Sequence, residues 1–325
     1  MNIVMKMFRV IKPGFFTTVQ DLGRHGFLKY GVPISGAMDD FSLRLANILV
    51  GNDPADACLE LTMLGPELEV LHETEIAVAG GDITVQTNGQ EAQMWQTLKV
   101  KSGDVISFGN VKTGCRVYLA VRGGINVPIT LGSRSTYVRC EMGGVQGRQL
   151  KTEDCIDGFD DAQPMGFRLL VPQEYVPDFS TEARVRVVLG PQLESFTEKG
   201  VETFLSNPYM VTLEADRMGY RLEGLIIEHR ERVGMISDAI LPGSVQVPPS
   251  GKPIITMQDA QTTGGYAKIA AVISSDVHIL GQLKPNDWIR FQRTTFPEAH
   301  RELAEYYNKI HIIESGLHRQ HMSRI

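Results

Sequence analysis

Arginine, lysine, aspartate and amide side chains gather in four glycine-rich segments of this sequence. The first segment, residues 17–39, places Gln20, Asp21 and Arg24 close together around Gly23. An arginine guanidinium presents a planar fork of donors that fits a carboxylate or a phosphate. These three residues could therefore hold a small polar molecule. The alternative is an ion pair between Asp21 and Arg24 that only closes the turn.

The second segment joins Arg122-Gly123-Gly124 to Arg134, which stands among serine and threonine residues. Glycines at a strand end let backbone N–H groups approach a ligand, and hydroxyls beside an arginine suit an anion. However, no helix is expected after these glycines, and the phosphate-binding pattern G-x-x-x-x-G-K-[ST] does not occur in the chain. We therefore interpret this segment as a structural loop.

The third segment crowds an acid, two cations and a hydrogen-bonding ring into one short stretch. These are Asp216, Arg217, Tyr220 and Arg221. Such a density of charge is costly to bury unless the charges pair with one another or meet a ligand. A ligand site and a structural network of ion pairs are both consistent with this pattern.

The fourth segment extends from Gly243 to Lys268 and surrounds an expected strand at Ile254–Met257. Polar side chains follow that strand, namely Asp259, Gln261, Thr262 and Thr263. Gly264 and Gly265 then permit a close approach of the backbone, and Lys268 adds a cation. A long polar loop between buried strands is typical of a pocket wall.

Several classes of site are excluded by what the sequence lacks. No Gly-x-Ser-x-Gly pattern occurs and no histidine stands in a triad-like context, so a serine hydrolase is not supported. The four cysteines are widely spaced with no CxxC pair, which indicates reduced cytosolic thiols and no metal site. His311, His318 and His321 are expected to lie in a mobile C-terminal tail.

Composition and charge narrow the possible partners. The formal net charge is −6 and basic residues form no stripe, so no nucleic-acid partner is expected. No apolar run approaches the roughly 18 residues that a membrane span needs. The first residues lack a secretory signal, so we expect a soluble, cytoplasmic protein with no membrane partner. Residues 1–6 are expected to be an extension outside the fold.

Most of the chain has the pattern of short strands separated by turn signals, so we expect a mainly β protein. The turn signals include Gly80-Gly81, Asn88-Gly89, Ser102-Gly103 and Asn286-Asp287. Helical periodicity occurs only at 40–50, 191–205 and 297–312. A proline-containing acidic connector, Val171–Glu182, separates two β-rich halves. The predicted boundaries are 7–178, 179–295 and 296–325, the last being a C-terminal helix and tail.

Seven motifs in these segments, in this order, resemble one protein family. They are TTVQDLGRHG, GVPISGAMD, AVRGGI, LGSRST, DRMGYRL, GSVQVPPSGKPI and QDAQTTGGYAKIA. The sequence is similar to the allophanate hydrolase subunit 2, or biotin-dependent carboxyltransferase, family. Its stand-alone bacterial members include the C subunit of 5-oxoprolinase and KipA-type proteins. The resemblance covers about residues 7–291 and implies two cyclophilin-like β-barrel halves with few short helices.

The resemblance also implies a reaction and partners. The chain would act with the KipI-like B subunit and the A subunit of 5-oxoprolinase to convert 5-oxo-L-proline, ATP and water into L-glutamate, ADP and phosphate. ATP, with Mg²⁺, would be used by the complex, and the chain alone would be inactive. Activation by ATP is chemically reasonable because a lactam is a stabilised amide.

Carried over onto this chain, the resemblance gives two sets of site residues. The expected catalytic residues are Arg217, Asp259 and Lys268. The expected substrate-binding residues are Gln20, Asp21, Arg24, Asp216, Tyr220, Gln261, Thr262, Gly264 and Gly265. Arg24 or Arg217 would hold the substrate carboxylate, and Lys268 a phosphate or carbonyl oxygen.

Two alternatives from other classes remain. In the first, the chain is a carboxyltransferase-like component that acts with biotin on a urea-like amide. In the second, it antagonises a KipI-type inhibitor of a sensor kinase and carries out no chemistry of its own.

Overall fold

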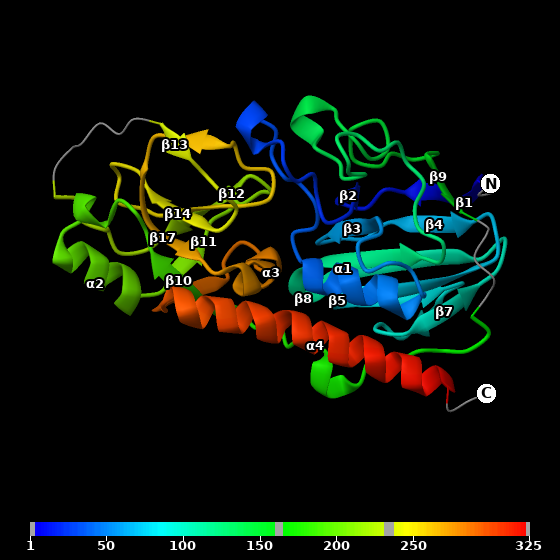
Figure 1. The fold of residues 1–325 in the computed structure, drawn as a ribbon. Helices are drawn as coiled ribbons and strands as arrows, with labels where there is room; N and C mark the ends of the chain where they lie inside the picture. The colour runs from blue at the N-terminus through cyan, green and yellow to red at the C-terminus, as the bar shows by residue number, and fades with distance from the viewer. Residues whose placement is uncertain (1–3, 160–164, 231–236, 323–325) are drawn as a thin grey trace. The chain divides into compact units, whose positions relative to one another are not determined.

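Strands dominate both parts of the computed structural model, which describes residues 4–159, 165–230 and 237–322 (Figure 1). Contacts divide the chain into two units whose segments alternate along the sequence. The first unit comprises Met1–Arg24, Ser35–Phe179 and Asn308–Ile325, and the second comprises His25–Ile34 and Ser180–Tyr307. The domain boundaries expected from the sequence stay a prediction.

The first unit is built on a nine-stranded, half-barrel sheet with the order β2-β3-β8-β4-β1-β9, to which β5, β6 and β7 are attached through β8. The strands are β1 (Val4–Lys12), β2 (Phe16–Gln20), β3 (Cys58–Thr62), β4 (Glu67–Val70), β5 (Thr74–Thr87), β6 (Gln90–Ala92), β7 (Thr97–Val100), β8 (Val105–Val121) and β9 (Cys155–Phe159). Its apolar core includes Val19, Leu59, Leu61, Val117 and Leu119, which alternate with polar residues along β2, β3 and β8.

One expected turn is wrong, because Gly80-Gly81 lies inside the continuous strand β5. Gly80 adopts a φ of +120°, and the register between β5 and β8 shifts at this point. A Cβ atom on Gly80 would lie 2.5 Å from the carbonyl oxygen of Arg116. The glycine therefore makes a β-bulge rather than a chain reversal.

The second unit contains a closed seven-stranded barrel with the order β10-β17-β14-β15-β12-β11-β18. Its strands are β10 (Glu182–Leu189), β11 (Tyr209–Val211), β12 (Gly219–Glu223), β14 (Ser244–Val247), β15 (Ile254–Thr256), β17 (Ala267–Val272) and β18 (Trp288–Arg293). A separate two-stranded sheet pairs β13 (Asp238–Ala239) with β16 (Thr263–Gly264). The expected mainly β fold is confirmed.

Helices are few and mostly short. They are α1 (Asp40–Leu49), α2 (Glu198–Ser206), α3 (Val277–Gly281) and α4 (Phe296–Met322). Single 3₁₀ turns occur at Leu28–Tyr30, Val138–Cys140, Gln173–Tyr175, Leu193–Ser195 and Ser274–Asp276. The helix expected over 191–205 begins only at Glu198, where the hydroxyl of Thr197 caps the backbone N–H of Gly200.

The C-terminal helix is longer than expected, since α4 continues to Met322 and no mobile tail begins at His311. Ile310, Ile313 and Leu317 are buried within the first unit. Their spacing of three and four residues extends the apolar stripe of the helix by about two turns. The sequence prediction stopped at residue 312 because it took the intervening charged residues as a solvated end.

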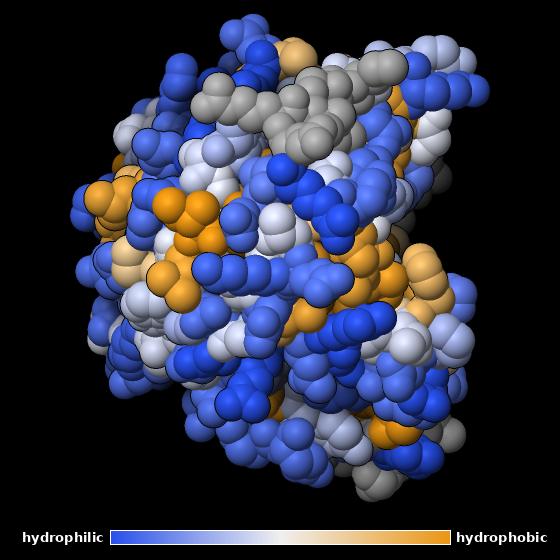
Figure 2. Space-filling view, turned by 90° about the vertical axis from the view of Figure 1, so that its left-hand side faces the viewer, coloured by the Kyte–Doolittle hydropathy of each residue, from blue (hydrophilic) through white to orange (hydrophobic). Residues whose placement is uncertain are grey.

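The N-terminal expectation is also corrected in part, because Val4, Met5 and Lys6 lie in β1 and pair with β9. Residues 1–3 lie outside the described residues. Within the described part of the chain, no helix is long and apolar enough to cross a membrane. On the face shown in Figure 2, apolar side chains form separate groups among polar ones rather than one continuous band.

Candidate functional site

Asp21 organises the loop that follows β2. Its carboxylate accepts hydrogen bonds from the hydroxyls of Ser133 and Ser135, at 2.6 and 2.5 Å, and from the backbone N–H of Arg134 and Gly23. The second sequence segment is therefore bound to the first through this carboxylate. Asp21 therefore holds the two loops together.

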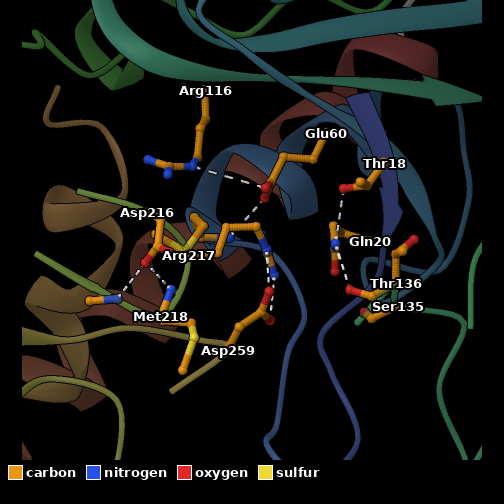
Figure 3. Close-up of polar contacts among 12 residues, drawn as sticks. Thr18, Gln20, Glu60, Arg116, Ser135, Thr136, Asp216, Arg217, Met218 and Asp259 are labelled. Atoms are coloured by element: carbon orange, nitrogen blue, oxygen red, sulfur yellow. Dashed lines mark hydrogen bonds and ion pairs between the residues drawn. The ribbon is translucent and has the colours of Figure 1, made fainter. Parts of the chain in front are cut away.

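Gln20 and Arg24 are both fully buried in the same region of the first unit. Nε2 of Gln20 donates to the hydroxyl of Thr18 at 3.0 Å and to the carbonyl of Thr136 at 3.1 Å (Figure 3). Its Oε1 atom is buried and accepts no hydrogen bond. Arg24 donates to the carbonyl oxygen of Ser135. An orphaned buried acceptor is costly, so Gln20 Oε1 marks a place where a ligand N–H or a water molecule would be stabilised.

The sheet beneath this loop carries a row of buried polar side chains that the sequence predictions missed. Thr18, Glu60 and Tyr118 are direct cross-strand neighbours on β2, β3 and β8. Because side chains alternate along a strand, Gln20 and Arg116 lie on the same face as this row. A charged residue between Leu59 and Leu61, at the centre of an apolar strand, was the signal that could have revealed it.

This row fixes the start of α1. Oε2 of Glu60 accepts hydrogen bonds from the backbone N–H of Met38 at 2.9 Å and from the Tyr118 hydroxyl at 2.6 Å. The same hydroxyl accepts a hydrogen bond from the backbone N–H of Asp39. Burial, together with the nearby Glu60 carboxylate, raises the pKa of Tyr118 well above its ordinary value. The hydroxyl is therefore neutral and serves as a donor to Glu60.

In the second unit, Arg217 and Asp259 form a buried bidentate ion pair. Nε and Nη2 of Arg217 lie 2.9 and 3.1 Å from the two carboxylate oxygens of Asp259, as Figure 3 shows. The backbone N–H of Asp259 also donates to the carbonyl of Arg217. The third and fourth sequence segments thus meet here, and one side of the guanidinium fork is occupied by protein.

The neighbours of Arg217 in the third segment have structural contacts. The carboxylate of Asp216 accepts hydrogen bonds from the backbone N–H groups of Met218 and Gly219, which is an Asx turn at the start of β12. Tyr220 is buried in the barrel, and its hydroxyl donates to the carbonyl of Leu283 at 3.3 Å.

Lys268 is a buried cation of the same unit. Its ammonium group forms an ion pair with Asp238 of β13 and donates to the carbonyl of Ala239 at 2.8 Å. Lys268 lowers the pKa of the Asp238 carboxyl, with help from the backbone N–H of Ala239. The paired strand β16 includes Gly264, while Gln261 and Gly265 are exposed and Thr262 is half-buried.

Two hollows lie in the first unit, and the expected site residues line neither of them. One, of about 760 Å³, is lined by residues that include Gln96, Phe167 and Arg168. The other, of about 810 Å³, is lined by residues that include Trp95 and Lys112. The polar loops described above carry more convergent chemistry than these hollows, so we place the candidate site in the loops of each unit.

Comparison with known proteins places this geometry in context. Residues 30–293 match the family described as carboxyltransferase domain, subdomain A and B. The chain is 37% identical over 297 residues to the 5-oxoprolinase C subunit of Escherichia coli, a match that covers 90% of this chain and 93% of the relative. It is 34% identical over 310 residues to urea amidolyase of Saccharomyces cerevisiae, a match that covers 90% of this chain and 17% of the relative.

Among solved structures, the urea amidolyase of K. lactis superimposes with a TM-score of 0.90 at 32% identity. The match covers 95% of this chain and 20% of that protein. The likeness therefore extends over both units of this chain, while most of the yeast enzyme has no counterpart in it.

Proposed function

This chain belongs to the carboxyltransferase domain family, subdomains A and B, and from that premise we propose that it is the C subunit of an ATP-dependent 5-oxoprolinase. In this role it acts with the KipI-like B subunit and the A subunit to open 5-oxo-L-proline to L-glutamate. It has no turnover alone and works in the cytoplasm.

The observation that carries the proposal is the match to the C subunit of E. coli 5-oxoprolinase over 93% of that protein. The urea amidolyase relative is nearly as similar in sequence, but the match spans only 17% of it. The match therefore includes nearly the whole of the C subunit, whereas it includes only one part of the larger enzyme.

The geometry supplies groups that suit a small cyclic amide acid. In the second unit, Arg217 and Lys268 are buried cations, each on a carboxylate of the protein. Cations stabilise the negative charge that develops on a lactam oxygen during attack. We propose Arg217 and Lys268 as substrate contacts, with Asp259 positioning Arg217.

We propose that ATP binds to the assembled complex and not to a phosphate-binding loop of this chain. Among residues 4–159, 165–230 and 237–322, no group of three His, Cys, Asp or Glu side chains could hold a metal ion. The sequence also has no Walker A pattern. We therefore assign to this chain no chemical step that uses ATP.

The test is reconstitution of the reaction. Release of glutamate and phosphate from 5-oxo-L-proline and ATP is measured for this chain alone, for the A and B subunits without it, and for all three together. Turnover in the full mixture only is the expected result. A stable complex with the B subunit that shows no turnover in the full mixture would overturn the proposal and favour the role of a KipI antagonist.

A second candidate, a biotin-dependent carboxyltransferase component, is favoured by the TM-score of 0.90 to the K. lactis urea amidolyase. In that case, carboxylation of urea by labelled bicarbonate would require this chain and a biotinylated carrier, and avidin would block it. Labelled product that forms without this chain would exclude this role.

A further inference from the structure

A buried amide without a partner lies beside Lys268. Gln246 of β14 and Lys268 of β17 are direct partners in the antiparallel register of the barrel. Antiparallel partners place their side chains on the same face of a sheet. Gln246 is 3% exposed, and its Nε2 group donates to no acceptor. The sequence predictions passed over it, although it stands among the residues of the fourth segment.

Both side chains end beneath the small β13–β16 sheet. The ammonium group of Lys268 contacts Asp238 and Ala239 of β13. A Cβ atom on Gly264 of β16 would lie 2.8 Å from Nε2 of Gln246, so this amide lies against the glycine backbone. Asp238 and Gly264 are themselves register partners. Two donors, a cation and an amide, therefore converge at one end of this sheet.

We propose that Lys268 and Gln246 form a recognition site for the carboxylate of a small ligand, and that Asp238 occupies this site until the ligand displaces it. Gln246 is thus a specificity residue, and Asp238 is an internal competitor. The assignment rests on the proposed function only for the identity of the ligand, 5-oxo-L-proline. It gives Lys268 the substrate carboxylate and leaves the lactam oxygen to Arg217, whose fork already binds Asp259.

The contacts of the Asp238 side chain explain why a ligand can displace it from Lys268. Its side chain is 48% exposed, whereas that of Lys268 is 10% exposed. Its other side-chain contacts are the backbone N–H of Ala239 and a long hydrogen bond of 3.3 Å from Gln192. When the ligand binds, its carboxylate replaces that of Asp238 on Lys268, and the Asp238 side chain turns to solvent. The ligand gains a hydrogen bond from Gln246 that Asp238 does not make, because Nε2 is unpaired in its presence.

The experiment is a ligand-observed NMR titration of the full chain with three probes. These are 5-oxo-L-proline, glutarate, and 2-pyrrolidone, which has the lactam ring without the carboxylate. Asp238→Asn is expected to tighten the binding of both carboxylates about fivefold, since a half-exposed ion pair leaves only a fraction of the molecules competent to bind. The dissociation constant of 2-pyrrolidone is expected to stay unchanged.

Gln246→Met tests the second donor. It is expected to weaken carboxylate binding roughly five- to tenfold. The melting temperature is expected to stay the same or rise, because an unpaired buried amide is replaced by an apolar group of similar shape. A residue with only a structural role would show the opposite combination.

Glu223→Gln is the matched control, since it removes the carboxylate from the exposed Lys252–Glu223 pair of the same unit and should change no affinity. The proposal is overturned if neither carboxylate binds to wild type or to Asp238→Asn. It is also overturned if Asp238→Asn tightens 2-pyrrolidone equally. Binding of glutarate but not 5-oxo-L-proline, with the expected response to both variants, would uphold the site and count against the proposed function.

Discussion

Some buried polar side chains in this protein have hydrogen-bond partners for all their polar atoms, and others keep one atom without a partner. Asp21 accepts four hydrogen bonds from three loop residues and Gly23. Gln20 and Gln246 each keep one buried side-chain atom without a partner. An unpaired buried atom costs folding free energy, and at these two amides we propose that a ligand or a water molecule supplies the missing partner.

Arg217 and Asp259 give the first prediction at this scale. Arg217→Ala leaves a buried carboxylate without its cation and is expected to lower the free energy of unfolding by about 3 kcal/mol. The double variant Arg217→Met/Asp259→Leu removes both charges and is expected to recover most of that loss. Denaturant unfolding of the three proteins checks this.

Measurement of turnover distinguishes a catalytic role of the Arg217–Asp259 pair from a role in folding alone. If Arg217 contacts the substrate, the reconstituted complex containing the stable double variant should lose at least tenfold in kcat/KM. Wild-type turnover by that double variant would show that the pair only supports the fold.

Two buried tyrosines give the second prediction, which concerns pH. Burial raises the pKa of Tyr209 to about 12, whereas the unfolded chain ionises near pH 10. Between these values the unfolded state loses a proton that the folded state keeps, so stability falls as pH rises. Tyr209→Phe is expected to make that fall shallower by up to about 1 kcal/mol per pH unit. Urea unfolding at pH 8, 10 and 11.5 measures the slope.

Tyr118→Phe is the control for Tyr209→Phe, and the two variants are compared at pH 8. The Tyr209 hydroxyl has no hydrogen-bond partner, so its removal should be neutral or slightly stabilising at pH 8. The Tyr118 hydroxyl donates to Glu60 and accepts from Asp39, so its removal should cost about 1–3 kcal/mol. Equal losses in the two variants would contradict the hydrogen-bond assignment.

At the scale of the element, strand periodicity places the polar row of the first unit. Thr18, Glu60 and Tyr118 face one side of the sheet because they are in register, and Val19, Leu59 and Leu119 face the apolar core. A shift of one residue in β3 would bury Leu59 on the polar side and Glu60 in the core. The register of three strands thus fixes the start of α1 beside the first motif.

The β-bulge in β5 gives the third prediction. Gly80→Ala would bring Cβ to 2.5 Å from the Arg116 carbonyl and is expected to cost about 2–4 kcal/mol. Gly89, in the hairpin between β5 and β6, also has a positive φ, but a Cβ atom there would have no other atom within 4 Å. Gly89→Ala should cost only about 1 kcal/mol. Similar losses in both variants, measured by thermal unfolding, would contradict a special role for the bulge.

At the scale of the whole molecule, the two units are not simple consecutive pieces of chain. Residues 25–34 belong to the second unit, and Asn308–Ile325 return to the first. Within the first unit, the ammonium group of Lys309 lies 5.0 Å from the ring centroid of Phe41, and Gln320 donates to the carbonyl of Leu170. The end of α4 therefore contributes to a unit that is otherwise complete before residue 180.

The fourth prediction is that deletion of residues 308–325 destabilises the first unit. Loss of the buried Ile310, Ile313 and Leu317 should speed hydrogen exchange in α1 and β8 at least tenfold, with much smaller changes in β14 and β17. Gly316→Ala in the intact chain is the control. It should slightly stabilise the protein, because this helical glycine has open space at Cβ. Faster exchange confined to the barrel would contradict the assignment of the helix end.

The sequence by itself determined the mainly β class, the start of α1 and the four segments where polar residues gather. These features depend on local patterns such as alternation, caps and turn residues, which act over a few positions. It also pointed to Arg217, Asp259 and Lys268, since charges clustered beside glycines are visible in one dimension.

Only the tertiary structure decided which of those groups are already paired. Asp259 meets Arg217 across 42 positions, and Asp238 meets Lys268 across 30. It also decided that Gly80 makes a bulge, that α4 returns to the first unit, and that Gln246 lies beside Lys268. Strand register and long-range contact set these outcomes, and neither is encoded in any short stretch of chain.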